Sequence, residues 1–208
     1  MVKTAVLVSG GGTNLQAIID AHGRGAVKNC ELAAVISSSP DAYALTRAEN
    51  AGIRTVVADR GAYGSRAEFD AAVARAVADS GAELIVLSGF MFILPAEVAG
   101  KYGNRIINVH PALIPSFCGK GFYGLRVHEA VIAAGVRVTG ATVHFADGGV
   151  DSGPIILQKA VDVLPDDTPE SLQRRVMEQA EHIILPRAVS LFCEGRLRVD
   201  GKRVFIEG

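Results

Sequence analysis

Short apolar segments alternate with helix-like segments through the first half of the chain, and this pattern constrains the fold more than any other feature. The apolar segments are rich in Val, Ile and Leu without regular polar alternation, as expected for strands buried on both faces of a parallel sheet. We predict strands at residues 4–9, 32–37, 55–58, 84–88 and 105–109, and helices at residues 14–22, 42–51, 65–80 and 96–102. Strand–helix–strand units in series predict an α/β fold with a doubly wound, mostly parallel sheet and helices on both faces.

The second half of the chain follows a different pattern, which begins with a loop rich in Pro and Gly. Here we predict a helix at residues 125–134, strands at 137–145 and 155–163, a long helix from 168 onward and a hairpin at 196–206. Thr168 can cap the long helix, with Pro169 in its first position. Pro186 lies inside this helix and is expected to kink or break it.

The charge balance excludes a typical nucleic-acid binder, because 21 Lys and Arg against 22 Asp and Glu give a net charge of −1. The three cysteines are far apart, and no group of His, Cys, Asp or Glu has the spacing of a metal site. No stretch approaches the roughly 20 apolar residues of a membrane span, and the first apolar run is too brief for a signal sequence. We expect a cytoplasmic protein, monomer or homodimer, that binds a small molecule without a metal, nucleic acid or membrane.

A glycine-rich loop connects the first predicted strand to the first predicted helix. Gly10, Gly11 and Gly12 let the backbone turn sharply, and the following helix start offers free N–H groups and partial positive charge to an anion. Thr13 and Asn14 add side-chain donors. The third glycine of a dinucleotide loop and the Gly-Lys-Ser/Thr of a triphosphate loop are both absent. The loop therefore indicates a single phosphate monoester, and the alternative is a tight turn that binds nothing.

Two polar side chains, Asn108 and His110, stand at the end of the last strand of the first half. Residues two apart on a strand share a face, and ligands of open α/β sheets bind at the carboxyl ends of the strands. Asp151 lies in a glycine-rich loop, where a carboxylate has little structural reason to be. If it lies near His110, it should raise the pKa of the imidazole and orient it. The trio predicts direct group transfer with acid–base help, and the alternative is a hydrogen-bonded structural pair.

The strings SGGGTNLQ, SGFMFIL, NVHPALIP, TGATVHF and DSGPII follow one another between residues 9 and 156. In order and spacing they closely resemble the phosphoribosylglycinamide formyltransferases, folate-dependent enzymes of purine synthesis with a Rossmann-like fold. The resemblance runs from residue 2 to about residue 192. It implies that glycinamide ribonucleotide attacks the formyl carbon of 10-formyltetrahydrofolate. No linker, repeat or low-complexity segment divides the chain, so we expect one domain over residues 1–208. Its parts would be a nucleotide-binding half (1–111), a half with the folate loop and closing helix (112–194), and a hairpin (195–208).

The resemblance implies a role for each matching residue. Asn108 would bind the formyl oxygen, His110 would stabilise the oxyanion and donate a proton, and Asp151 would keep His110 charged and oriented. The substrate-binding residues would be Gly12, Thr13 and Asn14 at the phosphate and Glu181 at the ribose hydroxyls. The folate-binding residues would be Asn108, Arg66, Met91, Phe92, Ile93, Leu94, Asp147, Gly148, Gly149, Val150 and Asp151.

Two positions depart from the family pattern. Phe92 stands where relatives often have Arg or Lys, which leaves more of the contact with the folate tail to Arg66. Glu178 stands where relatives often have Lys or Gln, so no cationic contact to the phosphate is expected there.

Several of these residues also fit simpler structural roles. Met91, Phe92 and Leu94 could be core residues, Arg66 could be a solvated charge, and Glu181 could pair with Arg174 or Arg175 on an exposed helix face. His144 could be a buried structural histidine or a partner of Asp151. The alternative functions are a formyltetrahydrofolate hydrolase, a methionyl-tRNA formyltransferase, or a nucleotide-binding regulator without chemistry.

Overall fold

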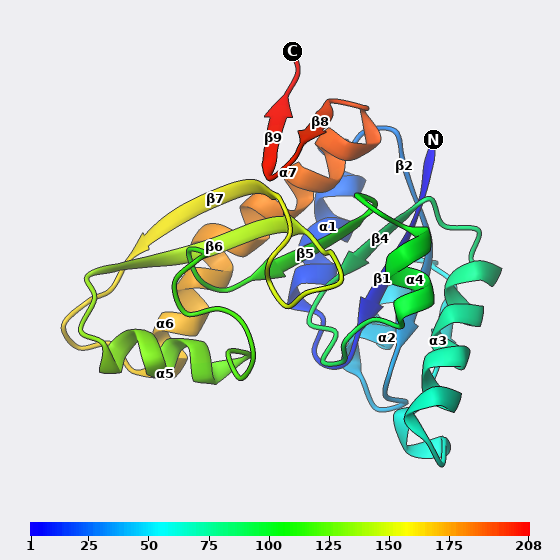
Figure 1. Ribbon diagram of the computed structural model, residues 1–208, viewed down its shortest axis with the longest axis horizontal. Coiled ribbons are helices and arrows are strands. Elements are labelled where there is room, and N and C mark those ends of the chain that lie inside the picture. Colours follow the sequence, from blue (N-terminus) through cyan, green and yellow to red (C-terminus); the bar gives the residue numbers. More distant parts are fainter.

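A single nine-stranded sheet runs through the computed structural model, which describes all 208 residues (Figure 1). The strands lie in the order β3-β2-β1-β4-β5-β6-β7-β9-β8. Their bounds are β1 Val2–Val8, β2 Cys30–Ser37, β3 Thr55–Val57, β4 Leu84–Leu87, β5 Ile106–His110, β6 Val138–Phe145, β7 Ile155–Asp162, β8 Leu197–Asp200 and β9 Arg203–Ile206. The first five strands are parallel, whereas β6 runs antiparallel to both β5 and β7. The predicted α/β fold with a mostly parallel sheet is therefore confirmed.

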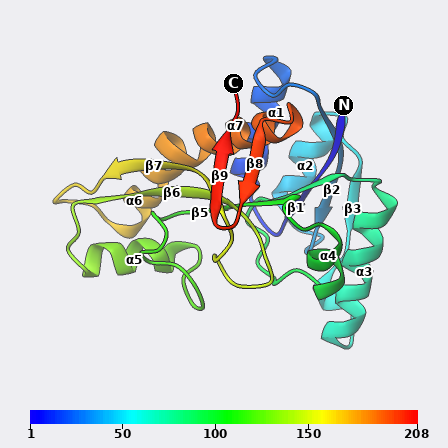
Figure 2. The same ribbon diagram turned by 45° about the horizontal axis from the view of Figure 1, so that its top comes forward.

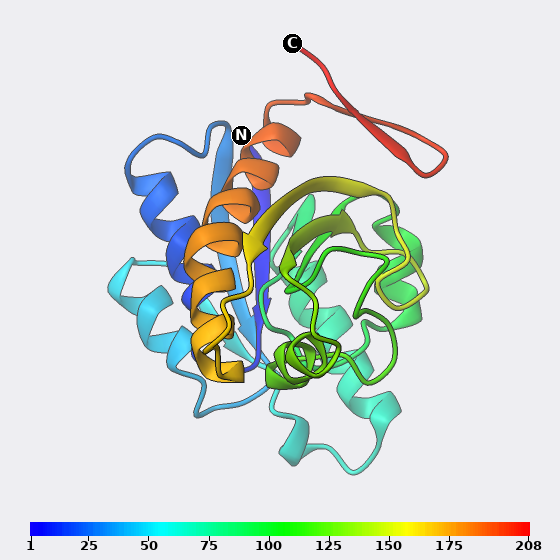
Figure 3. The same ribbon diagram turned by 90° about the vertical axis from the view of Figure 1, so that its left-hand side faces the viewer.

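Helices cover both faces of the parallel part of the sheet (Figure 3). Their bounds are α1 Thr13–Gly23, α2 Tyr43–Asn50, α3 Arg66–Asp79, α4 Ala96–Lys101, α5 Leu125–Ala133, α6 Pro169–Val176 and α7 His182–Cys193. Alternate residues of β1 point to opposite faces. Val6 and Val8 pack with α1, α2 and α7, while Ala5 and Leu7 pack with α3 and α4. None of these helices has the length and apolar character that a membrane crossing requires.

Two helix starts follow the predicted chemistry. Ser65 caps α3 in a capping box with Glu68, and Thr168 caps α6 with Pro169 in its first turn. These side chains satisfy backbone N–H groups that have no partner inside the helix. The sequence therefore fixes where each of these helices begins.

Pro186 does not break the long helix, so that part of the expectation that it kinks or breaks the helix is wrong. It lies inside α7, and the departure from α geometry comes earlier, in a π-helical segment at Met177–Glu181. Buried residues recur every four positions here, at Leu172, Val176, Ala180, Ile184 and Ala188. Because an α-helix turns about 100° per residue, four residues overshoot a full turn by about 40°. The wider π turn takes up part of this drift and keeps the apolar positions facing the sheet.

Candidate active site

The site lies at the carboxyl ends of β1, β4 and β5, next to the point where the helices change face between β1 and β4. Ligands of doubly wound sheets bind at such a point. Ser9 joins the loops here, since its hydroxyl lies 2.6 Å from the Ser38 hydroxyl and accepts a 3.0 Å hydrogen bond from the Met91 N–H. The loops that follow β1, β2 and β4 therefore form one connected rim.

The glycine loop has the conformation that the sequence predicts. Gly12 caps α1 with φ +70°, in the left-handed region that favours glycine. A Cβ atom at Gly12 would lie 2.6 Å from the Ala44 Cβ, so the loop also needs the missing side chain. The backbone N–H groups of residues 10–15 donate no hydrogen bond within the chain. The loop and first turn of α1 thus present a row of free donors, as an anion site requires.

Asn14 and Glu181 are hydrogen-bonded to each other. Asn14 Nδ2 donates to Glu181 Oε2 at 2.5 Å, while Asn14 Oδ1 is buried without a partner. Glu181 is only 6% exposed, and burial raises the pKa of its carboxyl, although the hydrogen bond from Asn14 opposes this. Pairing of Glu181 with Arg174 or Arg175 on an exposed face is therefore wrong. Two of the four expected substrate residues are therefore in direct contact, and the Asn14 amide links α1 to the π segment.

Met177 contacts the glycine loop from the π segment. The Thr13 hydroxyl lies 3.6 Å from the Met177 sulfur, whereas Glu178 is exposed. No cation reaches Thr13 from this helix.

The polar trio is brought together by the pairing of β5 with β6. Asn108 lies opposite His144, and Asn108 Nδ2 is 3.2 Å from His144 Nε2. Asp151 lies between two rings, with one carboxylate oxygen 3.6 Å from His110 Nδ1 and the other 3.7 Å from His144 Nε2. These distances are longer than a direct hydrogen bond. The interaction of Asp151 with both histidines is therefore electrostatic, and His144 is a partner of Asp151 as well as a buried residue.

Asp151 is fixed by backbone geometry. It has φ +53°, and one of its carboxylate oxygens accepts a 2.9 Å hydrogen bond from the Gly119 N–H. Burial acts to raise the pKa of Asp151. However, His144, the Gly119 N–H and His110 together lower that pKa below its usual value. The carboxylate therefore stays ionised well into the acid range.

Opposing effects act on the pKa of His110. His110 is 4% exposed, and burial lowers the pKa of its imidazole below the usual value. The Phe117 carbonyl, 2.8 Å from Nε2, and the Asp151 carboxylate both act to raise this pKa, but burial outweighs them. In the free chain burial thus favours the neutral imidazole, whereas Asp151 favours the charged one.

The contact between His110 and the Phe117 carbonyl could not be predicted from the sequence. Phe117 lies in the loop between β5 and α5, with φ +50°. A backbone carbonyl carries no sequence signal, and the strained φ at a phenylalanine is set by the fold of the loop.

The expected folate segment divides into two kinds of residue. Met91 and Ile93 are 55% and 68% exposed. In contrast, the ring centres of Phe92 and Phe69 are 4.9 Å apart, and Leu94 packs against the same core cluster. Arg66 is not a free charge, because it bonds Asp70 at 2.6 Å and the Ile93 carbonyl at 2.5 Å. The core interpretation thus holds for Phe92 and Leu94 and fails for Met91.

The loop between β6 and β7 carries Asp151 and is folded around Asp147. Asp147 Oδ1 accepts hydrogen bonds from the Gly149 N–H at 3.0 Å and the Ser152 hydroxyl at 2.6 Å. Gly148 and Val150 lie exposed at its tip. The β8–β9 hairpin runs toward this loop (Figure 2), and Lys202 Nζ donates to the Ser152 carbonyl at 2.6 Å. Sequence reasoning missed Lys202, since no local pattern places a hairpin turn beside a loop about 50 residues earlier.

Comparisons with known proteins agree with this architecture. The family model described as formyl transferase matches residues 2–189. Phosphoribosylglycinamide formyltransferase of Haemophilus influenzae is 39% identical over 100% of this chain and 95% of its own length. The trifunctional purine biosynthetic protein adenosine-3 of Gallus gallus is 46% identical over 95% of this chain, which spans only 19% of that relative.

A solved structure gives the same result. The crystal structure of glycinamide ribonucleotide transformylase 1 from Symbiobacterium toebii superposes with a TM-score of 0.93 at 45% identity, covering 100% of this chain and 95% of that one. The strand order, the glycine loop and the matched residues 2–189 therefore point to one conclusion. This chain belongs to the formyl transferase family.

Proposed function

We propose that this chain transfers the formyl group of 10-formyltetrahydrofolate to the amine of glycinamide ribonucleotide. One observation carries the proposal: a row of free N–H groups at residues 10–15 and the Asn108–His110–Asp151 trio occupy the same edge of the sheet. The first group suits a phosphate and the second suits transfer of a carbonyl-level group. The relatives in Haemophilus influenzae and Symbiobacterium toebii carry names with the same activity.

The acceptor would lie between the glycine loop and the trio. Its phosphate would bind the free N–H groups of the loop, and its ribose hydroxyls would bind Glu181. The exposed side chains of Met91 and Ile93 offer an apolar surface for the folate ring. The loop that carries Asp147, Gly148 and Gly149 would then cover the ring.

The chemistry begins when the acceptor amine attacks the formyl carbon. The formyl oxygen gains negative charge, which the Asn108 amide N–H stabilises. Neutral His110 takes the proton that the amine loses, and Asp151 stabilises the imidazolium as it forms. The imidazolium then protonates N10 of the folate as the C–N10 bond breaks. The products are formylglycinamide ribonucleotide and tetrahydrofolate.

His110 must exchange a hydrogen bond during this sequence. Nδ1 faces Asp151, so Nε2 is the nitrogen that would turn to the reacting atoms. In the free chain Nε2 is bonded to the Phe117 carbonyl. We propose that the substrates displace this carbonyl from His110.

The test is to mix the purified chain with glycinamide ribonucleotide and 10-formyltetrahydrofolate and to identify the products by mass spectrometry. We expect a formylated ribonucleotide that forms only when both substrates are present. Formate released without the acceptor would identify a hydrolase instead. Formylation of methionyl-tRNA with no reaction of the ribonucleotide would identify a tRNA enzyme. Binding without any product would leave only a regulator.

A further inference from the structure

Helix α2 supports the glycine loop from behind. The Ala44 N–H, in the first turn of α2, donates to the Gly10 carbonyl at 3.1 Å. One turn further on, Arg47 Nε donates to the Gly11 carbonyl at 2.8 Å. The carbonyls of two consecutive glycines therefore point toward α2.

This anchoring sets the direction of the free N–H groups. In a trans peptide the C=O and the following N–H point in opposite directions. Holding the Gly11 carbonyl against α2 therefore aims the Gly12 N–H away from α2. Because glycine backbone is otherwise free to rotate, the side chain of Arg47 selects one orientation.

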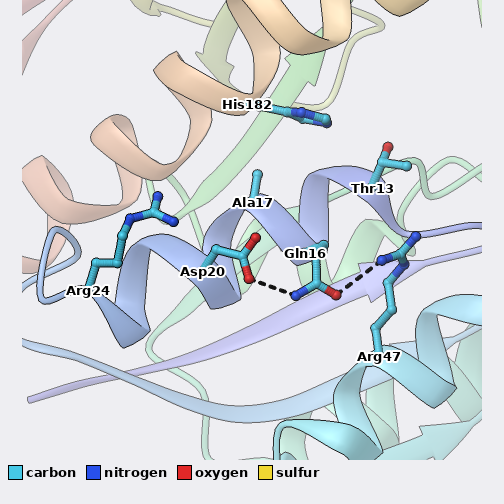
Figure 4. Close-up of a pocket in the computed structure, with 7 residues that line it drawn as sticks. All are labelled: Thr13, Gln16, Ala17, Asp20, Arg24, Arg47 and His182. Carbon is cyan, nitrogen blue, oxygen red and sulfur yellow. Dashed lines mark hydrogen bonds between the residues drawn. The ribbon is translucent and has the colours of Figure 1, made fainter.

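Arg47 is itself held in place. Its Nη1 donates to Gln16 Oε1 at 3.1 Å, and Gln16 Nε2 donates to Asp20 at 2.8 Å (Figure 4). The guanidinium also lies 4.9 Å from the centre of the Tyr43 ring. This network connects α2 to α1 directly behind the loop.

Arg47 also brings positive charge to the glycine loop, and no other cationic side chain is bonded to this loop. It lines a cavity of about 320 Å³ with Thr13, Gln16, Ala17, Asp20, Arg24 and His182. Burial lowers the pKa of His182, so this ring contributes little charge near pH 7. The Arg24 side chain makes no hydrogen bond or ion pair, and only its backbone N–H is bonded, to the Asp20 carbonyl. From the opposite helix the loop receives Met177, a neutral side chain.

We propose that Arg47 is a positioning residue for the acceptor phosphate, which orients the N–H groups of the glycine loop and balances the phosphate charge from behind it. The inference rests on the proposed function, since it requires a phosphorylated acceptor. It goes beyond that function because it assigns specificity for the phosphate to a side chain of α2 outside the loop.

The test compares Arg47→Gln and Arg47→Lys with Arg24→Gln, a control in the same cavity without a hydrogen bond to the loop. We expect Arg47→Gln to raise the KM for glycinamide ribonucleotide about 10-fold, as loss of a charge-assisted hydrogen bond does. The KM for 10-formyltetrahydrofolate and the kcat should change less than about twofold. Arg47→Lys should recover part of the loss, and Arg24→Gln should behave like the unmodified chain.

Binding of inorganic phosphate, measured by calorimetry, provides a readout that does not depend on turnover. The Arg47→Gln variant should bind phosphate about 10-fold more weakly than the unmodified chain. Equal affinity, or equal increases in both KM values, would overturn the inference even if the chain formylates the ribonucleotide. An unmodified chain that binds phosphate through Arg47 but forms no product would overturn the proposed function alone. Circular dichroism checks that each variant is folded, and Arg47→Lys remains informative if Arg47→Gln is not.

Discussion

At the scale of single residues, the pKa of His110 is set by neighbouring groups that act in opposite directions. Both ring nitrogens of His110 face acceptors, the Phe117 carbonyl and the Asp151 carboxylate, and both favour the charged ring. Burial favours the neutral ring and has the larger effect. In the proposed mechanism His110 would accept a proton during the attack and return it to the leaving group.

Replacement of His110 by Ala should lower kcat by about 10² to 10⁴, since the proton acceptor is lost. The KM values should change little, because the phosphate and the folate ring bind elsewhere. Steady-state kinetics on His110→Ala and on His22→Ala, a histidine far from β5 in sequence that bonds the Cys30 carbonyl, would check this. A His110→Ala variant with normal kcat would rule out the acid–base role.

The pH dependence of kcat/KM should report the lowered pKa of His110. In the proposed mechanism the reactive form has a neutral imidazole, so activity should fall toward acid with a midpoint below the usual value of 6.5. Asp151 acts to raise that pKa, so Asp151→Asn should move the midpoint to still lower pH while lowering kcat. Initial rates measured between about pH 4 and pH 9 would show both effects. A midpoint that Asp151→Asn moves upward would contradict the assignment.

At the scale of elements, the loop between β6 and β7 holds Asp151 with help from the C-terminal hairpin. Lys202 bonds the Ser152 carbonyl and lies 3.5 Å from Asp147 Oδ2. Its side chain is 72% exposed, so the ion pair itself is screened by water. The contact acts mainly by holding the carbonyl next to Asp151 in one position.

Lys202→Ala should lower kcat/KM for 10-formyltetrahydrofolate about threefold to fivefold, the effect of a contact worth up to about 1 kcal/mol. Lys202→Arg should retain most of the activity, because it keeps a donor and the charge. Lys159, an exposed lysine of β7, supplies a matched control. Initial rates are measured with 10-formyltetrahydrofolate varied at saturating ribonucleotide. An unchanged kcat/KM in Lys202→Ala would show that the contact between Lys202 and the Ser152 carbonyl does not support the site.

Most strands and helices could be predicted from the sequence, because apolar runs and capping residues are local patterns. The strands begin and end within about two residues of the apolar runs, and Ser65 and Thr168 cap the helices as expected. Asn108 and His110 share a face by strand geometry alone. In contrast, the Asn14–Glu181 bond and the support from Arg47 join segments far apart in the chain. Such pairings depend on how helices pack, which no local pattern records.

At the scale of the whole molecule, two core clusters on opposite faces of the sheet stabilise the fold. The larger cluster includes Val131 of α5, and His128 of the same helix is fully buried. Neither ring nitrogen of His128 has a partner, and burial lowers its pKa to about 4. An uncharged imidazole is therefore part of the interior, and protonation must oppose folding.

The free energy of unfolding should decrease with acid for this reason. A histidine with a pKa near 6.5 when unfolded and about 4 when folded contributes stability that is present above pH 6.5 and lost as the pH falls toward 4. The loss between pH 7 and pH 5 should be about 2 kcal/mol for His128. His128→Leu should remove that part of the pH dependence. Denaturant unfolding at pH 7 and pH 5 measures the free energy of unfolding of both proteins. If the variant loses as much stability between these pH values as the unmodified chain, His128 is not the cause of the loss.

The π segment has a further consequence in terms of chain length. A single π turn is equivalent to one extra residue inserted into an α-helix. The residues before and after the turn still point to the same side of the helix, although the chain between them is one residue longer. A related protein with one residue fewer between Val176 and Glu181 could form an uninterrupted α-helix and still bury the same positions. The segment Met177–Glu181 thus marks a place beside the candidate active site where the helix can hold one residue more. Glu181 stays in contact with Asn14 despite the extra residue.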